Sequence, residues 1–296
     1  MFPPYVSLAA LDQKIHEALS EDVGLGDIST QATISPDTQA TARFLAKSDG
    51  ILAGKRVAER VFNLVDATLE VVWTAEDGDP LTKGTYFGTV KGLARSVLVA
   101  ERLALNFLQR MSGIATATHR MVEAVKPHPV HILDTRKTVP GLRLLDKWAV
   151  LLGGGKNHRI GLFDMMMIKD NHITAAGGIR KALEAAREYR EKQNLDVEIE
   201  IETRTLDEVQ EVLSAGGADR IMLDNMTTKM QNGCLDVSML TEAVRLIGKR
   251  YKTEASGNVT LDTIPQIAAT GVDFISSGSL THSVVALDIS LKIQLT

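Results

Sequence analysis

Charged side chains stand directly after several short apolar runs in the second half of the chain. Arg136 and Lys137 follow VHILDT, Lys169 ends MMMIK, and the acids Glu202 and Asp224 end VEIEIE and RIMLD. A guanidinium clamps a carboxylate with two parallel hydrogen bonds, and an ammonium attracts phosphate as a point charge. The two acids can either pair with Lys169 or hold Mg2+ together with waters and a substrate pyrophosphate. These residues predict a site for a small anion, although Lys169 also suits a Schiff-base nucleophile.

Small residues follow the last two apolar runs of the chain. Ser256 lies in KTEASG, Gly278 lies in ISSGS, and His282 comes shortly afterwards. Barrel enzymes often bind a phosphate at this place through backbone N–H groups. Plain turn chemistry is the alternative for each motif alone, but the two motifs together predict a terminal phosphate site.

The segment GGGKNHRIG, residues 153–161, combines glycines with cationic side chains. It is not a Walker A motif, because Lys156 is followed by Asn157 instead of Ser or Thr. We expect a flexible glycine stretch that delivers Lys156, His158 and Arg159 to a ligand and can close over it. An ordinary surface loop is the alternative.

The elements that position these residues alternate along the chain. The ends of the apolar runs are separated by roughly 22 to 33 residues, which suits strand–helix units. Amphipathic helices are predicted between the runs, at 177–189, after a capping box of Thr205 and Glu208, and around 239–247. Such alternation predicts a parallel sheet, and at least six units favour a closed or nearly closed barrel. The strand-end residues would then meet at one mouth of the barrel.

The first part of the chain has a different pattern. Residues 8–20 have helical spacing, and a second helix is predicted at 97–110, with a stop or bend at Ser112 and Gly113. Between them, short alternating segments resemble strands at 41–47, 69–79 and 84–97. We expect a small sheet packed on one or two helices.

Composition limits the possible functions. The chain has 296 residues, 44% apolar and 24% charged, with a net charge of -4 that provides no general basic surface for nucleic acid. It has no apolar run of about 18 residues and no signal-peptide pattern at its start, so we expect no membrane contact and a cytoplasmic or similar reducing location. A single cysteine, Cys234, excludes an internal disulfide and a Cys-based zinc site.

Several ordered motifs closely resemble those of the quinolinate phosphoribosyltransferases, also called nicotinate-nucleotide pyrophosphorylases (carboxylating). They are DTRKTVPGLRLLDKWAVLLGGGKNHRIGLFDMMMIKDNHI, AERLALNFLQRMSGIAT, IMLDN, EASGN and SSGSLTHS, with EDVGLGDIST and FLAKSDGILAG nearer the start. The resemblance covers nearly the whole chain. It implies an α/β fold: an N-terminal α/β sandwich domain over 1–112, joined by the segment 283–296, and an incomplete, TIM-like α/β barrel over 113–282.

The resemblance also implies a reaction and its residues. The phosphoribosyl group of phosphoribosyl pyrophosphate would be transferred to quinolinate, with decarboxylation to nicotinate mononucleotide in NAD biosynthesis. The implied quinolinate residues are Arg136, His158, Arg159 and Lys169, with Arg102 contributed by a second subunit. The implied phosphoribosyl pyrophosphate residues are Lys137, Lys169, Glu202 and Asp224, with Mg2+ held by the two acids, and with Ser256, Gly278 and His282 around the 5-phosphate. The family works as a homodimer or as a hexamer, a trimer of dimers, with shared active sites.

Three other functions compete with this one. A nicotinate phosphoribosyltransferase would handle one carboxylate and release no CO2, but the cations gathered here exceed what one carboxylate requires. A Schiff-base lyase would use Lys169 as its nucleophile. A non-catalytic protein that binds a phosphorylated metabolite would use the same charges without turnover.

Overall fold

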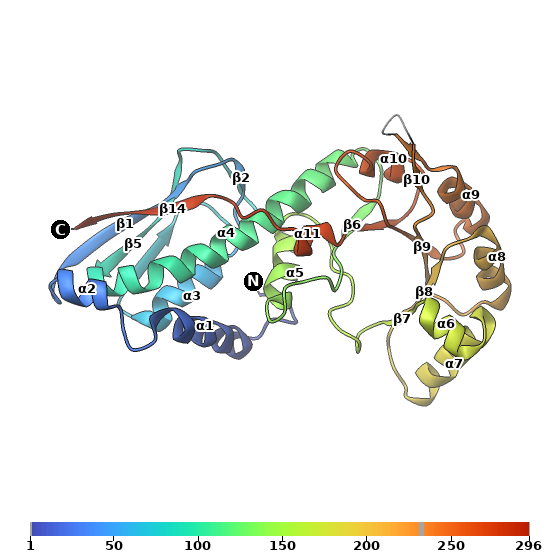
Figure 1. Ribbon diagram of the computed structural model, residues 1–296, viewed down its shortest axis with the longest axis horizontal. Coiled ribbons are helices and arrows are strands. Elements are labelled where there is room, and N and C mark those ends of the chain that lie inside the picture. Colours follow the sequence, from blue (N-terminus) through green and yellow to red (C-terminus); the bar gives the residue numbers. More distant parts are fainter. Residues whose placement is uncertain (1, 231–233, 296) are drawn as a thin grey trace. The chain divides into compact units, whose positions relative to one another are not determined.

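Apolar and polar residues alternate along 39–46, and they form strand β1 (Gln39–Ala46) in the computed structural model, which describes residues 2–230 and 234–295. This strand lies in a four-stranded antiparallel sheet with the order β14-β1-β5-β3. Its partners are β3 (Glu70–Trp73), β5 (Tyr86–Leu93) and β14 (Ile289–Leu295). Figure 1 shows the C-terminal strand β14 returning to the side of β1. Strands were therefore predicted correctly in this part of the chain.

Aromatic side chains form the core beneath this sheet. The Phe44 ring of β1 stacks on Trp73 of β3 at a centroid distance of 4.7 Å and lies 5.7 Å from Phe87 of β5. It also meets Phe62 of helix α3 (Lys55–Val65) edge to face at 6.0 Å. Such ring pairs add to the free energy gained from apolar burial. They attach α3 to the sheet.

The long helix α4 (Ala94–Ala124) continues through the predicted stop at Ser112 and Gly113. The prediction of a stop was wrong, because both residues serve packing. The buried Ser112 hydroxyl accepts a hydrogen bond from the backbone N–H of Ala53 at 2.9 Å. A Cβ on Gly113 would lie 2.3 Å from the carbonyl oxygen of Val285. The glycine allows two backbones to approach closely, and the helix tolerates it.

Further elements complete this part of the molecule. They are the helices α1 (Leu8–Val23), α2 (Ile28–Thr33) and α5 (Arg143–Leu152), and the short paired strands β2 (Gly50–Ile51) and β4 (Pro80–Leu81). The predicted helix at 8–20 is therefore confirmed as α1. An ion pair between Arg110 and the fully buried Asp146 connects α4 to α5, with Nε and Oδ1 2.8 Å apart.

The chain divides into two compact units. The first contains residues 1–119, 138–154 and 280–296, and the second contains residues 120–137 and 155–279. This division places 138–154 with the antiparallel sheet. The domain boundaries predicted from the sequence stay a prediction.

Six parallel strands form the sheet of the second unit, in the order β6-β13-β12-β9-β8-β7. They are β6 (His131–Leu133), β7 (Met166–Ile168), β8 (Ile199–Thr203), β9 (Arg220–Asp224), β12 (Lys252–Ser256) and β13 (Phe274–Ser276). Among the described residues, the end strands β6 and β7 do not pair with each other. The barrel is therefore incomplete, as the family resemblance implied.

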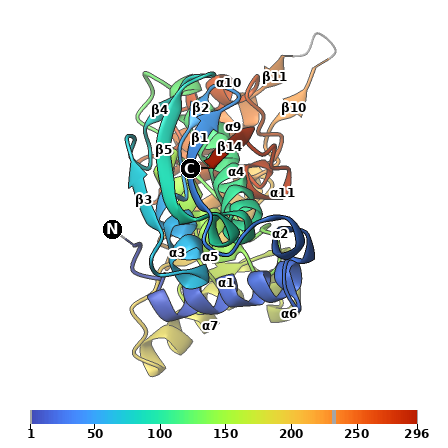
Figure 2. The same cartoon turned by 90° about the vertical axis from the view of Figure 1, so that its left-hand side faces the viewer.

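Helices follow the strands of this barrel and cover it, as Figure 1 shows for α7, α8 and α9. The helices are α6 (Asp170–Ala176), α7 (Ile179–Lys192), α8 (Leu206–Ala215), α9 (Ser238–Ile247), α10 (Ile264–Ala268) and α11 (Ser279–His282). The predicted capping box of Thr205 and Glu208 begins α8. Strands β10 (Thr228–Lys229) and β11 (Leu235–Asp236) pair as a small hairpin, seen in Figure 2.

Strand register decides which side chains enter the barrel. Glu200 of β8 pairs with Arg220 of β9, and Arg220 pairs with Lys252 of β12. Because side chains alternate along a strand, Glu202 and Glu254 point to the same side as these residues. Charged side chains therefore occupy an interior that apolar layers usually fill. In the described part of the chain, no helix is long and apolar enough to cross a membrane.

Candidate active site

A cavity of about 490 Å³ opens at the C-terminal ends of the six parallel strands. Its lining combines cations, acids and small polar groups. The lining residues are Thr135, Arg136, Lys137, His158, Arg159, Met167, Lys169, Glu202, Arg204, Met222, Asp224, Asn225, Glu254, Ser256 and Ser276. This is the end of an α/β barrel at which catalytic residues gather.

The structure brings together most of the residues that the sequence singled out. The predicted residues in the cavity lining are Arg136, Lys137, His158, Arg159, Lys169, Glu202, Asp224 and Ser256. Gly278 follows β13 in the same unit but is not part of the lining. Arg102 and His282 belong to the first unit, where both are exposed. Lys156 is also exposed and outside the lining.

Glu202 lies between two cations. Its Oε2 atom is 3.2 Å from Nζ of Lys169, and its Oε1 atom is 2.8 Å from Nη2 of Arg204. The Nε atom of Arg204 is 3.5 Å from Oδ2 of Asp224. Sequence reasoning did not single out Arg204, although its place directly after the end of β8, two residues beyond Glu202, was a signal for it.

Glu202 and Asp224 are the residues of this cavity that could hold Mg2+. Arg204 contacts both carboxylates, so its guanidinium supplies the positive charge between them in this structure. Carboxylate oxygens are the protein ligands that Mg2+ prefers, usually one or two of them with waters and substrate phosphates.

The segment that carries His158 and Arg159 is anchored to the barrel. Lys156 forms a parallel bridge with Leu133 of β6. The carboxylate of the buried Asp134 accepts hydrogen bonds from the Asn157 side chain at 2.6 Å and from the His158 backbone N–H at 2.9 Å. His158 and Arg159 are only 7% and 8% exposed. The segment is therefore not an ordinary surface loop.

Two guanidinium groups stand close together in this pocket. Burial, and then the neighbouring charge of Arg136, lower the pKa of Arg159. The Nη1 atom of Arg159 donates to the carbonyl oxygen of Met165 at 3.2 Å. A ligand with negative charge would relieve the repulsion between the two cations.

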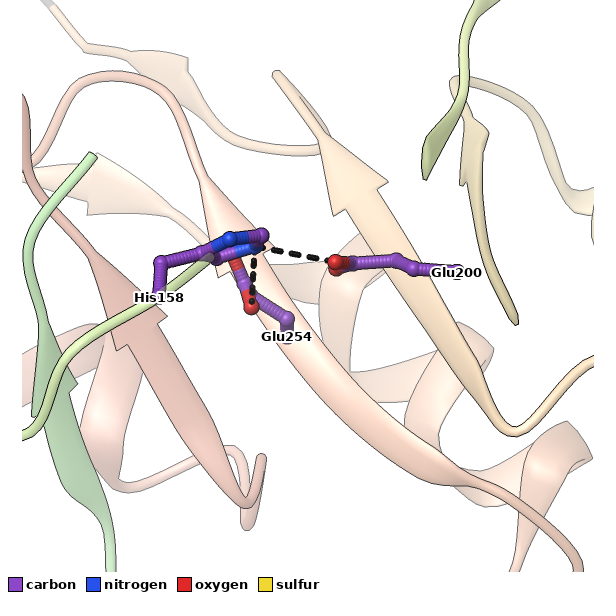
Figure 3. Close-up of side chains that lie close together, drawn as sticks. All are labelled: His158, Glu200 and Glu254. Atoms are coloured by element: carbon purple, nitrogen blue, oxygen red, sulfur yellow. Dashed lines mark ion pairs between the residues drawn. The ribbon is translucent and has the colours of Figure 1, made fainter. Parts of the chain in front are cut away.

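A second charged cluster lies deeper in the barrel and consists of His158, Glu200 and Glu254 (Figure 3). The Nε2 atom of His158 is 2.9 Å from Oε2 of Glu200 and 3.5 Å from Oε2 of Glu254. Nη1 of Arg220 lies 2.9 Å from Oε2 of Glu254. Burial is the main cause that raises the pKa of Glu200 and that of Glu254, each to about 7. Two carboxyl groups so close together resist double ionisation.

Sequence reasoning missed this cluster as a functional feature. Glu200 was seen only as one acid of an alternating run, and Glu254 was not singled out. The signal was the alternation itself, because every second residue of β8 enters the barrel. The ligand atoms of the cluster lie within 4.8 Å of one another, as metal ligands do. The Arg220 guanidinium already supplies positive charge there, which makes an ion-pair cluster the simpler description.

The turn after β12 is shaped by a glycine. Gly257 has φ +95, and a Cβ on it would lie 2.2 Å from Oδ1 of Asn225. The backbone N–H of Asn225 donates to the carbonyl oxygen of Ser256 at 2.8 Å. The turn therefore lies against the end of β9, beside Asp224, where the sequence predicted a phosphate site.

Comparisons with known proteins cover nearly the whole chain. The family model described as quinolinate phosphoribosyl transferase, N-terminal domain, matches residues 27–112, and the model of its C-terminal domain matches residues 114–292. A Nicotiana tabacum protein named quinolinate phosphoribosyltransferase [decarboxylating] 2b, mitochondrial, is 57% identical over 99% of this chain and 84% of its own length. An Arabidopsis thaliana nicotinate-nucleotide pyrophosphorylase [carboxylating], chloroplastic, is 57% identical over 99% and 85%.

Solved structures agree with this result. The crystal structure of NadC from Streptococcus pyogenes has a TM-score of 0.90 and 40% identity, covering 99% of this chain and all of the other. A human nicotinic acid phosphoribosyltransferase structure has a TM-score of 0.58, 13% identity and a coverage of 98% and 74%. At that identity the likeness shows the fold alone.

Proposed function

Because the chain belongs to the quinolinate phosphoribosyltransferase family, we propose that the cavity at the end of its barrel is the active site. The enzyme transfers the phosphoribosyl group of phosphoribosyl pyrophosphate to quinolinate with loss of CO2. The products are nicotinate mononucleotide, pyrophosphate and CO2, in NAD biosynthesis. It is therefore a pentosyltransferase. The observation that carries the assignment of the site is that cations and acids from separate strand ends line one cavity.

We propose that Arg136, Arg159 and Lys169 hold the two carboxylates of quinolinate, with His158 beside them. Two carboxylates need more positive charge than one, and a guanidinium can bind each carboxylate through two parallel hydrogen bonds. The pocket wall next to these groups contains Met167 and Met222, which offer apolar contact to an aromatic ring. The pocket would thus orient the pyridine nitrogen towards the sugar.

Phosphoribosyl pyrophosphate would bind on the side of Lys137, Lys169, Glu202 and Asp224. Ser256, Gly278 and His282 are the proposed groups around its 5-phosphate. When bound at the two acids, Mg2+ would help to neutralise the departing pyrophosphate. The bond from ribose C1 to pyrophosphate breaks with oxocarbenium character, and a carboxylate of Glu202 or Asp224 offsets the positive charge that develops on the sugar.

Loss of CO2 follows from the new bond between the pyridine nitrogen and ribose C1. The ribosylated nitrogen is cationic, so it stabilises the electron pair left on the adjacent ring carbon when the carboxylate leaves as CO2. A proton from solvent then takes the place of the carboxylate on that carbon. The chain supplies orientation for this step, because Arg136 and Arg159 would grip the carboxylate that stays. Binding in this orientation means that the entropy cost of aligning the ring is met before the reaction begins.

We further propose a homodimer, or a trimer of dimers, in which Arg102 from a second subunit completes the quinolinate pocket. An exposed arginine in the first unit is available for such a role. We also propose a cytoplasmic or similarly reducing location, which the presence of a single cysteine in the sequence supports. Two of the relatives are named mitochondrial and chloroplastic. Determining the compartment of this protein in its own cell tests the proposed location directly.

The assay that tests this function uses quinolinate carrying isotope in the 2-carboxylate, with phosphoribosyl pyrophosphate and Mg2+. Equal amounts of nicotinate mononucleotide and labelled CO2 are expected. Nicotinate in place of quinolinate should give little product, and efficient use of nicotinate would favour the rival phosphoribosyltransferase. Borohydride trapping of a carbonyl substrate on Lys169 would favour the lyase. Ligand binding without any turnover would favour a binding protein.

A further inference from the structure

Arg204 bridges three carboxylates at the mouth of the barrel. Its Nη2 atom lies 2.8 Å from Oε1 of Glu202, its Nη1 atom lies 3.1 Å from Oδ2 of Asp170, and its Nε atom lies 3.5 Å from Oδ2 of Asp224. The acids come from three elements, since Asp170 begins α6 whereas Glu202 and Asp224 belong to β8 and β9. One guanidinium therefore neutralises acids that different strand ends bring together.

The backbone of Arg204 is anchored, but its side chain is accessible. Arg204 directly precedes Thr205, the N-cap of α8, and the Glu208 carboxylate accepts hydrogen bonds from the backbone N–H groups of both residues. The Arg204 side chain lines the cavity and is 50% exposed. A long side chain on such an anchor can change its partners by rotation about its own bonds while the strand and the helix stay in place.

Arg204 and a metal ion compete for the same oxygen atoms. Mg2+ is bound through carboxylate oxygens, and each oxygen of Glu202 already faces a cation. Oε1 contacts Arg204 at 2.8 Å, and Oε2 contacts Lys169 at 3.2 Å. Like charges that share one carboxylate repel each other. A metal ion at these acids therefore weakens their contacts with Arg204.

We propose that Arg204 is the counter-ion of Glu202 and Asp224 before the metal arrives, and a pyrophosphate-binding residue afterwards. Phosphoribosyl pyrophosphate brings negative charge together with Mg2+, and a planar guanidinium matches phosphate oxygens with two parallel hydrogen bonds. Asp170 lies outside the cavity lining, so its contact with Arg204 can persist during the exchange. This inference rests on the proposed role of the two acids in holding Mg2+ with phosphoribosyl pyrophosphate.

Binding of Mn2+ without any substrate tests the first role. Arg204→Gln removes the guanidinium charge from the two acids, and electron paramagnetic resonance measures bound Mn2+ without turnover. We expect Arg204→Gln to bind Mn2+ about fivefold or more tightly than the original protein, because the charge around a site sets its affinity. Arg204→Lys keeps the charge and should stay within about twofold of the original protein. Unchanged or weaker Mn2+ binding by Arg204→Gln would overturn the proposal.

Calorimetry with phosphoribosyl pyrophosphate and Mg2+, in the absence of quinolinate, tests the second role. We expect Arg204→Gln to bind this substrate about tenfold more weakly, although it binds Mn2+ more tightly. Arg204→Lys should recover little of that loss, because an ammonium lacks the planar fork. A general loss of structure would weaken both ligands instead of changing the two affinities in opposite directions. Equal affinity of Arg204→Gln and the original protein for the substrate contradicts the proposal.

A control variant and a crystal structure complete the test. Arg245→Gln is the matched control, because Arg245 is a 70% exposed arginine of α9 that pairs with Glu242, and it should leave both affinities within about twofold of their original values. In a crystal structure with Mg2+ and phosphoribosyl pyrophosphate, a guanidinium nitrogen of Arg204 should bind a pyrophosphate oxygen and no longer contact Glu202. A guanidinium that keeps its contacts with both acids would overturn the proposal.

Asp224→Asn separates this inference from the proposed function. If Asp224→Asn binds Mn2+ as tightly as the original protein, the proposed metal site fails, and the inference fails with it. If Asp224→Asn loses Mn2+ affinity but Arg204→Gln does not change it, the metal site stands and only the role of Arg204 is wrong.

Discussion

The ammonium group of Lys169 lies 3.2 Å from the Oε2 atom of Glu202, at the ends of the neighbouring strands β7 and β8. The proposed phosphate-binding lysine and the proposed metal-binding acid are thus one ion pair. The Lys169 side chain is 45% exposed, and Glu202 keeps its contact with Arg204 at 2.8 Å. The pair therefore contributes to the chemistry of the cavity more than to folding.

Lys169→Met should reduce kcat/KM by about 100-fold or more, because a cation at the developing charge of the leaving group is removed. The unfolding free energy should change by less than about 1 kcal/mol. Steady-state kinetics and urea unfolding measure the two quantities. Lys229→Met, at an exposed position of β10, is the control and should behave like the original protein. A large loss of stability in Lys169→Met would contradict this account.

Arg136→Ala and Lys137→Ala should affect different substrates, although the residues are adjacent. Loss of the Arg136 guanidinium should weaken quinolinate binding by about 100-fold, because two charged hydrogen bonds are removed. Binding of phosphoribosyl pyrophosphate should change little. Lys137→Ala should show the reverse pattern. Calorimetry with each ligand measures both affinities, and equal losses in one variant would contradict the division of roles.

Removal of Mg2+ with a chelator should abolish turnover, and Asp224→Asn should raise the Mg2+ concentration for half-maximal rate by about tenfold, because the charge of the ligands sets the affinity. Binding of Mn2+ followed by electron paramagnetic resonance gives a second measure that does not depend on turnover. Asp262→Asn, at an exposed position, is the matched control. Full activity in the presence of chelator would exclude the proposed metal.

Shared active sites predict complementation between inactive variants. If Arg102 acts in the pocket of a second subunit, mixing Arg102→Ala with Lys169→Ala protein should recover about a quarter of the original activity, because half of the dimers are hybrids with one intact site each. Mixing Arg136→Ala with Lys169→Ala should recover none, since both residues line the same cavity. The absence of any rescue in the first mixture would argue against shared sites.

The buried acid Glu254 should make stability depend on pH. Burial, and next the charge of Glu200, raise the pKa of Glu254 from 4.5 to about 7. Between these values the folded protein retains a proton that the unfolded chain has released, so the unfolding free energy falls as the pH rises. Glu254→Gln should remove about 2 kcal/mol of that fall between pH 5 and pH 7. Urea unfolding at both pH values measures it, and parallel pH profiles for the two proteins would be the contrary result.

The amino-acid sequence alone determined the order of strands and helices and the charges at the strand ends. Lys169, Glu202 and Asp224 were predictable because apolar periodicity marks where each strand stops, and parallel strands end at the same edge of a sheet. The first unit was also predictable as a small sheet with helices, since its strands alternate between buried and exposed residues.

Only the tertiary structure decided which residues share an environment. Gly113 was predicted to stop a helix, but it lies inside the continuous helix α4. A glycine stands there because a backbone segment far away in the sequence passes so close that a Cβ would not fit. Likewise, alternation placed Glu200 on one face of a strand without showing that Arg220 and His158 would meet that face. Local sequence determines the period of a strand, but the partners of a buried charge come from segments far away in the chain, and their register is set when the barrel assembles.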